Sequence, residues 1–96
     1  MKPASNEIKV LQNASESRFE VTVEGLLSVV DYVLQEGEIA LTHTYVPVEL
    51  RGRGLAEKLV RAALEFARTE QRRVVPACSY VDAFIARHTE FKPLLK

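Results

Sequence analysis

The spacing of apolar residues changes at Pro47, and this change limits the folds available to the chain. Before Pro47, apolar and polar residues alternate with period two, as in residues 18–23 and 38–45, which is typical of strands with one buried face. After Pro47, apolar residues recur at helical spacing between Leu55 and Ala67. The sequence therefore predicts an α+β architecture, in which an antiparallel sheet is followed by a long helix.

The rest of the chain completes this order of elements. The expected segments are an edge strand starting at 8–11, meander strands over 18–23, 26–34 and 38–45, a helix of about five turns after Pro47, a short strand over 74–78 and a helix over 79–87. Phe19, Val21 and Val23 should face the core. The apolar strand over 74–78 suits burial on both faces. Residues 1–7 lack apolar periodicity and are expected to be disordered.

Composition and charge narrow the possible functions. The chain has 96 residues, 47% of them hydrophobic and 27% charged, so we expect a single domain over 1–96 with one core. Thirteen Lys and Arg residues balance thirteen Asp and Glu residues. A neutral molecule exerts no long-range attraction on nucleic acid or anionic lipid, so binding to either is not expected.

The single cysteine and the start of the chain indicate a location. Cys78 cannot form an internal disulfide, and no signal-peptide pattern opens the sequence, so we expect a cytoplasmic protein. The apolar runs are far shorter than the roughly 20 residues needed to cross a bilayer. We expect a monomer or weak dimer, with neither a membrane partner nor a bound metal.

Residues 46–56 have the composition of a phosphate-binding turn. Gly52 and Gly54 allow a close backbone approach that a side chain would block, just where a strand ends and a helix begins. The free N–H groups of the first helical turn would then point toward an anion. Arg51 and Arg53 add positive charge locally. On spacing alone, an ordinary helix entry with solvated arginines explains the segment equally well.

Several short motifs carry a resemblance to a known family. Arg51-x-x-Gly54-x-Ala56 resembles the Q/R-x-x-G-x-G/A signature of the GNAT superfamily of N-acetyltransferases. Further motifs are similar to those of its small YjdJ-type subfamily: His43-Thr44-x-Val46-Pro47, Arg51-Gly52-x-Gly54-x-Ala56, Pro76-x-Cys78-Ser79-Tyr80-Val81, and His88 before Glu90-Phe91. The resemblance implies a minimal GNAT-like fold, in which an antiparallel meander is followed by a pyrophosphate-loop helix, a strand parallel to the preceding one and a C-terminal helix.

The same resemblance implies a cofactor and an activity. The expected cofactor is acetyl-coenzyme A or coenzyme A, and the expected reaction is acetyl transfer to an amine of unknown identity, on a protein or peptide for example. Main-chain groups of residues 44–46 would follow the pantetheine arm, and N–H groups of residues 51–56 would surround the pyrophosphate. The predicted cofactor-binding residues are Thr44, Tyr45, Val46, Arg51, Gly52, Arg53, Gly54, Leu55, Ala56 and Tyr80.

Two departures from the family pattern leave the activity open. The helical region that helps larger members form an acceptor pocket has no space between Leu11 and Arg18. The tyrosine that protonates the departing thiolate in larger members is also missing, because Ala86 stands five residues before Phe91. A coenzyme A-binding module without catalysis is therefore the alternative function.

Cys78 and His43 are the predicted catalytic residues. Cys78 stands where the last strand gives way to a helix, whose dipole would lower the pKa of the thiol and favour a thiolate able to attack a thioester. Its alternative role is that of a small core residue. His43 could act as a base if the face it shares with Ile39 and Leu41 lines a pocket. His88, by contrast, suits a structural role at a helix C-terminus.

Overall fold

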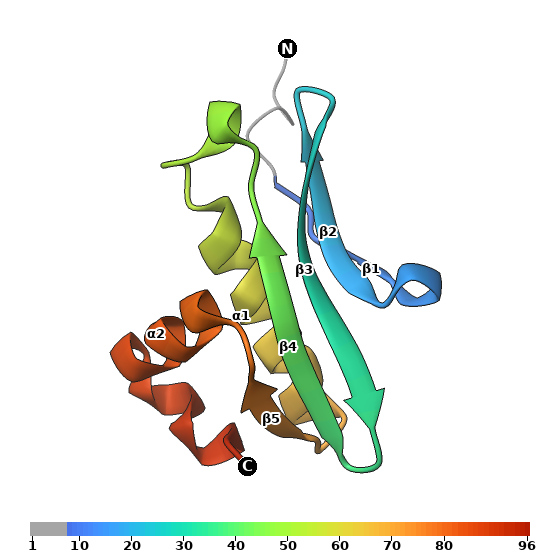
Figure 1. Cartoon of the computed structure of the whole chain (residues 1–96), viewed down its shortest axis with the longest axis vertical. Coiled ribbons are helices and arrows are strands. Elements are labelled where there is room, and N and C mark those ends of the chain that lie inside the picture. Colours follow the sequence, from blue (N-terminus) through green and yellow to red (C-terminus); the bar gives the residue numbers. More distant parts are fainter. Residues whose placement is uncertain (1–7) are drawn as a thin grey trace.

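A five-stranded sheet with helices packed against it forms the molecule (Figure 1). The computed structural model describes residues 8–96, so residues 1–7, expected above to be disordered, lie outside the described residues. The elements in order are β1 (Leu11–Asn13), η2 (Ala14–Glu16), β2 (Arg18–Val23), β3 (Leu26–Gln35), β4 (Glu38–Tyr45), η3 (Val48–Leu50), α1 (Leu55–Thr69), β5 (Arg73–Pro76), α2 (Ser79–Arg87) and η4 (Thr89–Leu94), where η denotes a 3-10 helix.

The sheet has the topology predicted from the sequence. Its strand order is β1-β2-β3-β4-β5, and neighbouring strands are antiparallel except for β4 and β5, which are parallel. The expected α+β fold, a meander followed by a helix and a parallel strand, is therefore confirmed. α1 connects β4 to β5, and its first turn lies beside the C-terminal end of β4 (Figure 1).

One face of α1 supplies much of the core. Its buried residues follow one another at steps of one, three or four positions and so form a stripe along the helix: Leu55, Leu59, Val60, Ala63, Leu64 and Ala67. Phe66 packs at 5.6 Å from the ring of Phe19 in β2 and at 6.2 Å from the ring of Tyr32 in β3, measured between ring centroids. Phe19 and Val21 are buried as predicted, and Val23 packs partly buried against this core.

A β-bulge in β4 changes which side chains face the core. Asp31 of β3 pairs with His43. Tyr32, the next residue of β3, pairs with Leu41, so Thr42 is an extra residue in β4. Asp31 and Tyr32 are consecutive and point to opposite faces of the sheet, and so do their partners. The expectation that His43 shares a face with Leu41 is therefore wrong, and His43 is exposed.

The two edge strands agree with expectation to different degrees. β1 begins at Leu11, within the expected range of 8–11, and Ile8 and Val10 pack against the core outside any strand. β5 ends at Pro76, and Val74 is its one buried residue, so burial on both faces was a wrong expectation. β5 lies at the edge of the sheet, where solvent reaches part of its surface.

The last helices lie against α1 and the β5 edge. Phe84 of α2 and Phe91 of η4 are buried, with ring centroids 6.1 Å apart. The guanidinium of Arg61 lies 5.5 Å from the Phe84 ring centroid and 5.6 Å from that of Phe91. Among residues 8–96, no helix has the length and apolar character to span a membrane. In the same part of the chain, His, Cys, Asp and Glu residues do not gather in groups of three that could hold a metal ion.

Candidate functional site

A cavity of about 430 Å³ opens where β4 ends and α1 begins. Its lining residues are Thr44, Tyr45, Val46, Leu50, Arg51, Gly52, Gly54, Leu55, Ala56, Glu57 and Tyr80. The structure therefore brings together every residue predicted to bind a cofactor except Arg53. Leu50 and Glu57 are additions that the sequence analysis missed. Leu50 stands directly before Arg51 and Glu57 directly after Ala56, so their position next to the predicted residues was the available signal.

Backbone donors face this cavity at the start of α1. Gly54 is the N-cap with a φ of 79°, a left-handed conformation that favours glycine. The first backbone hydrogen bond of α1 runs from Lys58 N–H to the Gly54 carbonyl (3.2 Å), so the N–H groups of residues 55–57 have no acceptor within the helix. Apart from its neighbours in the chain, no heavy atom of residues 8–96 lies within 4 Å of the position that a Cβ on Gly54 would occupy. The helix N-terminus is thus open to an anion.

The two arginines of the loop have different roles. Arg51 lines the cavity, and its Nε donates a hydrogen bond to the Val46 carbonyl at 2.8 Å, tying the loop to the end of β4. The Arg53 side chain instead forms an ion pair with Glu24 at 3.1 Å, toward the turn between β2 and β3. Its second contact is a 3.5 Å hydrogen bond to the Glu49 carbonyl. The positive charge at the cavity therefore comes from Arg51.

The Cys78 thiol lies directly behind the cavity wall. It is the N-cap of α2 and partly exposed, and its Sγ lies 3.5 Å from the Thr44 hydroxyl oxygen. Burial raises the pKa of the thiol, but hydrogen bonds from the Thr44 hydroxyl and from backbone groups of Val81, Tyr80 and Thr44 outweigh it. The pKa of Cys78 is therefore lowered from 9.0. These hydrogen bonds increase the fraction of thiolate at a given pH, while the residue also packs against the core.

His43 is not part of this arrangement. It lies outside the cavity, exposed on the face of the sheet that points away from Leu41, beside its cross-strand partner Asp31. The bulge at Thr42 is the reason, since the residue that turns toward Cys78 is Thr44. The structure therefore brings one of the two predicted catalytic residues next to the cavity.

Tyr80 and Glu57 form the side of the cavity nearest α2. Burial raises the pKa of the Tyr80 hydroxyl, so it stays protonated and can donate a hydrogen bond. The Glu57 carboxylate lies 3.7 Å from Nε2 of His88, whose ring stacks on Phe84 with centroids 4.1 Å apart. The backbone N–H of His88 also caps α2 by donating to the Phe84 carbonyl at 2.9 Å. His88 therefore lies at the C-terminus of α2, as expected, and also contacts Glu57 of the cavity wall.

Comparisons with known proteins agree on one family. Residues 18–94 match the family model described as GCN5-related N-acetyl-transferase. Protein NATD1 of Xenopus tropicalis is 30% identical over 85 residues, covering 84% of this chain and 77% of that protein. Protein NATD1 of Bos taurus is 43% identical over 47 residues, which are 49% of this chain and 42% of the bovine protein's length.

A solved structure has the same fold. It is the NMR solution structure of a GCN5-like candidate N-acetyltransferase from Staphylococcus aureus, with a TM-score of 0.75 over 95% of this chain and 90% of that one. The two sequences are 23% identical, so this likeness concerns the arrangement of strands and helices.

Proposed function

Since this chain belongs to the GCN5-related N-acetyl-transferase family, we propose that it binds acetyl-coenzyme A in the cavity and transfers the acetyl group to an amine. The observation that carries the proposal is the open N-terminus of α1, where unpaired N–H groups and Gly54 line one cavity. A diphosphate is the part of the coenzyme that such donors recognise.

The remaining cavity walls suit the rest of the molecule. A volume of about 430 Å³ lies in the usual range for small-molecule sites. Residues 44–46 form one wall at the end of β4, where an extended pantetheine arm can lie along the strand. Arg51 supplies a positive charge near the diphosphate, and Tyr80 supplies a neutral hydroxyl. When bound, acetyl-coenzyme A supplies a thioester whose carbonyl carbon accepts a nucleophile.

We assign Cys78 to the acyl-transfer step. Its thiolate is stabilised by Thr44 and by the first N–H groups of α2, and it lies next to the wall along which the pantetheine arm would run. As a nucleophile, Sγ forms a bond to the acetyl carbon while the bond from that carbon to the coenzyme's sulfur breaks. The acceptor amine then takes the acetyl group from Sγ and loses a proton to solvent.

Calorimetric titration with acetyl-coenzyme A and with coenzyme A tests the binding step. We expect micromolar binding by the wild type and its loss in Gly54→Glu, which places a carboxylate in the cavity. Gly37→Glu is the matched control, because Gly37 has a φ of 72° and open space around it but lies in the turn between β3 and β4. Absence of binding by the folded wild type would contradict the proposal.

A binding module without catalysis is the second candidate. It is favoured by the exposed position of His43 and by Ala86, also exposed, at the place of the larger members' tyrosine. Mass spectrometry after incubation with acetyl-coenzyme A separates the two, because the enzyme leaves acetyl on Cys78 or on an added lysine peptide. If a demonstrated transfer survived both Cys78→Ala and His43→Ala, the catalytic assignments would be wrong.

A further inference from the structure

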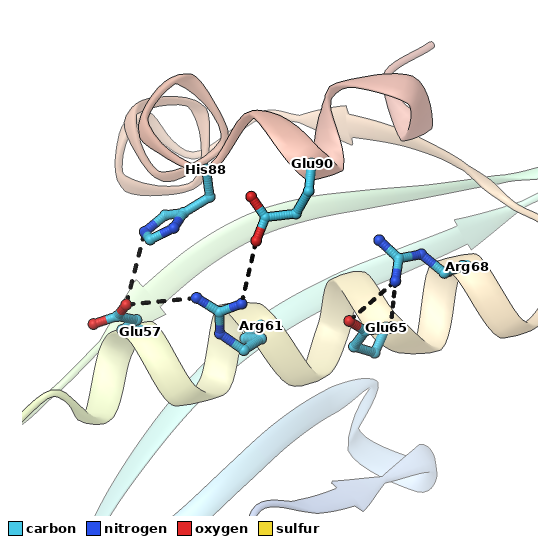
Figure 2. A network of polar contacts seen from close by, with 6 residues as sticks. All are labelled: Glu57, Arg61, Glu65, Arg68, His88 and Glu90. Atoms are coloured by element: carbon cyan, nitrogen blue, oxygen red, sulfur yellow. Dashed lines mark hydrogen bonds and ion pairs between the residues drawn. The ribbon is translucent and has the colours of Figure 1, made fainter.

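An ion-pair network connects the cavity wall to the last helix of the molecule (Figure 2). Glu57 lies in the first turn of α1 and lines the cavity. Its Oε2 lies 3.7 Å from Nη2 of Arg61, one turn later in α1, and 3.7 Å from Nε2 of His88. Arg61 also contacts Glu90 of η4 at 3.6 Å. The carboxylate at the cavity wall therefore shares one cation, Arg61, with a second carboxylate.

The charge of this network depends on His88. With His88 neutral, two carboxylates face the single guanidinium of Arg61, so the network carries a net negative charge. With His88 protonated, the charges balance. Histidine changes charge between about pH 5 and pH 8. The other titratable or charged groups on the elements that meet here are Lys58, Glu65 and Arg68 of α1, Tyr80, Asp82 and Arg87 of α2, and Lys92 of η4. Tyr80 stays neutral in this range because burial raises its pKa.

We propose that Glu57 determines the affinity of the cavity for anions, because its carboxylate weakens their binding. His88 acts through Glu57, and its protonated imidazole offsets this effect. This inference rests on the proposed function, because the anion concerned is the diphosphate of coenzyme A at the start of α1. Like charges repel, so a carboxylate in the first turn weakens diphosphate binding while His88 is neutral. Protonation of His88 relieves the repulsion, and by linkage a bound anion favours that protonated form.

The test is calorimetric titration of the full chain with dephospho-coenzyme A at about pH 6 and about pH 8. Its diphosphate is a diester that stays fully ionised, and it has no terminal phosphate that would titrate in this range. The variants are Glu57→Gln and His88→Phe. The second of them keeps an aromatic ring that can stack on Phe84. Glu65→Gln is the matched control, because Glu65 lies in the same helix and pairs with Arg68 at 3.1 Å but does not line the cavity (Figure 2).

We expect the wild type and Glu65→Gln to bind about threefold more tightly at the lower pH, the size of one screened charge interaction near a surface. Glu57→Gln should bind about threefold more tightly than the wild type at the higher pH, and His88→Phe should lose the pH dependence. The inference is overturned if Glu57→Gln binds no better than Glu65→Gln, or if His88→Phe keeps the wild-type pH dependence. Failure of every protein to bind would instead reject the proposed cofactor, and this inference with it.

Discussion

Burial raises the pKa of the Cys78 thiol, and hydrogen bonds lower it. Thr44→Val removes the hydroxyl that lies 3.5 Å from Sγ, and should raise the pKa of Cys78 because the thiolate loses one hydrogen bond. Alkylation by iodoacetamide, measured against pH, follows the thiolate, so the midpoint of the rate profile should move to higher pH. Thr42→Val is the control, since the Thr42 hydroxyl donates to the Asp31 carbonyl. Equal profiles for the two variants would contradict the role given to Thr44.

Ser28 presents a different problem at the residue scale. Its side chain is fully buried, and among residues 8–96 its hydroxyl has no hydrogen-bond partner. A buried polar group without a partner costs free energy, so Ser28→Ala should raise the free energy of unfolding by about 1 kcal/mol. Urea denaturation measures this change. Ser15→Ala, at an exposed position, should leave stability within about 0.5 kcal/mol of the wild type, and a loss of stability in Ser28→Ala would show an unrecognised partner.

Single residues also show how far the site could be predicted from sequence. Glycine at positions 52 and 54 indicated the open helix start, because the reason for glycine there is local in the chain. Glu57 was missed although it directly follows Ala56, because this position alone does not reveal that it lines the cavity. The direction of the Arg53 side chain could not be predicted, because its partner Glu24 is far away in sequence and comes close only when the chain is folded.

At the scale of elements, α1 has the largest share of the core, and Leu59 lies at the middle of its buried stripe. Leu59→Ala should lower the free energy of unfolding by about 2–5 kcal/mol, because Leu59 is fully buried and its removal leaves a cavity. Lys58→Ala changes the neighbouring exposed residue, and should have an effect of about 0.5 kcal/mol or less. Similar denaturation midpoints for both variants would mean that α1 is packed differently.

The periodicity of apolar residues predicted the strands and helices well, but it could not reveal a local irregularity such as a β-bulge. The strands over 18–23 and 38–45 and the helix over 79–87 have the predicted bounds, because period and breaker residues act locally. The β4 bulge left no mark on the alternation of residues 38–45, because the extra residue is defined by pairing with β3. β5 was expected to be buried on both faces, because an apolar run does not reveal that the strand lies at the edge of the sheet.

For the whole molecule, ligand binding and folding are linked through the cavity. Acetyl-coenzyme A at a hundred times its dissociation constant should stabilise the native state by about 2.7 kcal/mol. In a domain of this size, that corresponds to a rise in melting temperature on the order of 10 °C. Differential scanning calorimetry should show this rise for the wild type and Gly37→Glu but not for Gly54→Glu. A rise in Gly54→Glu equal to that of the wild type would place the ligand elsewhere.

The chemistry beside the cavity also depends on how β4 pairs with β3 around its bulge. The bulge at Thr42 is the reason that a hydroxyl, on Thr44, meets the Cys78 sulfur while an imidazole points away from it. Without the bulge, Thr42 and His43 of the same sequence would pair with Asp31 and Val30, and the His43 imidazole would take the place of the Thr44 hydroxyl. A slip of one residue in the register would then present a thiol and an imidazole to each other, and the alkylation profile of Cys78 would reveal the exchange. The pairing of the strand, as much as its composition, thus decides which pair of groups the fold brings together.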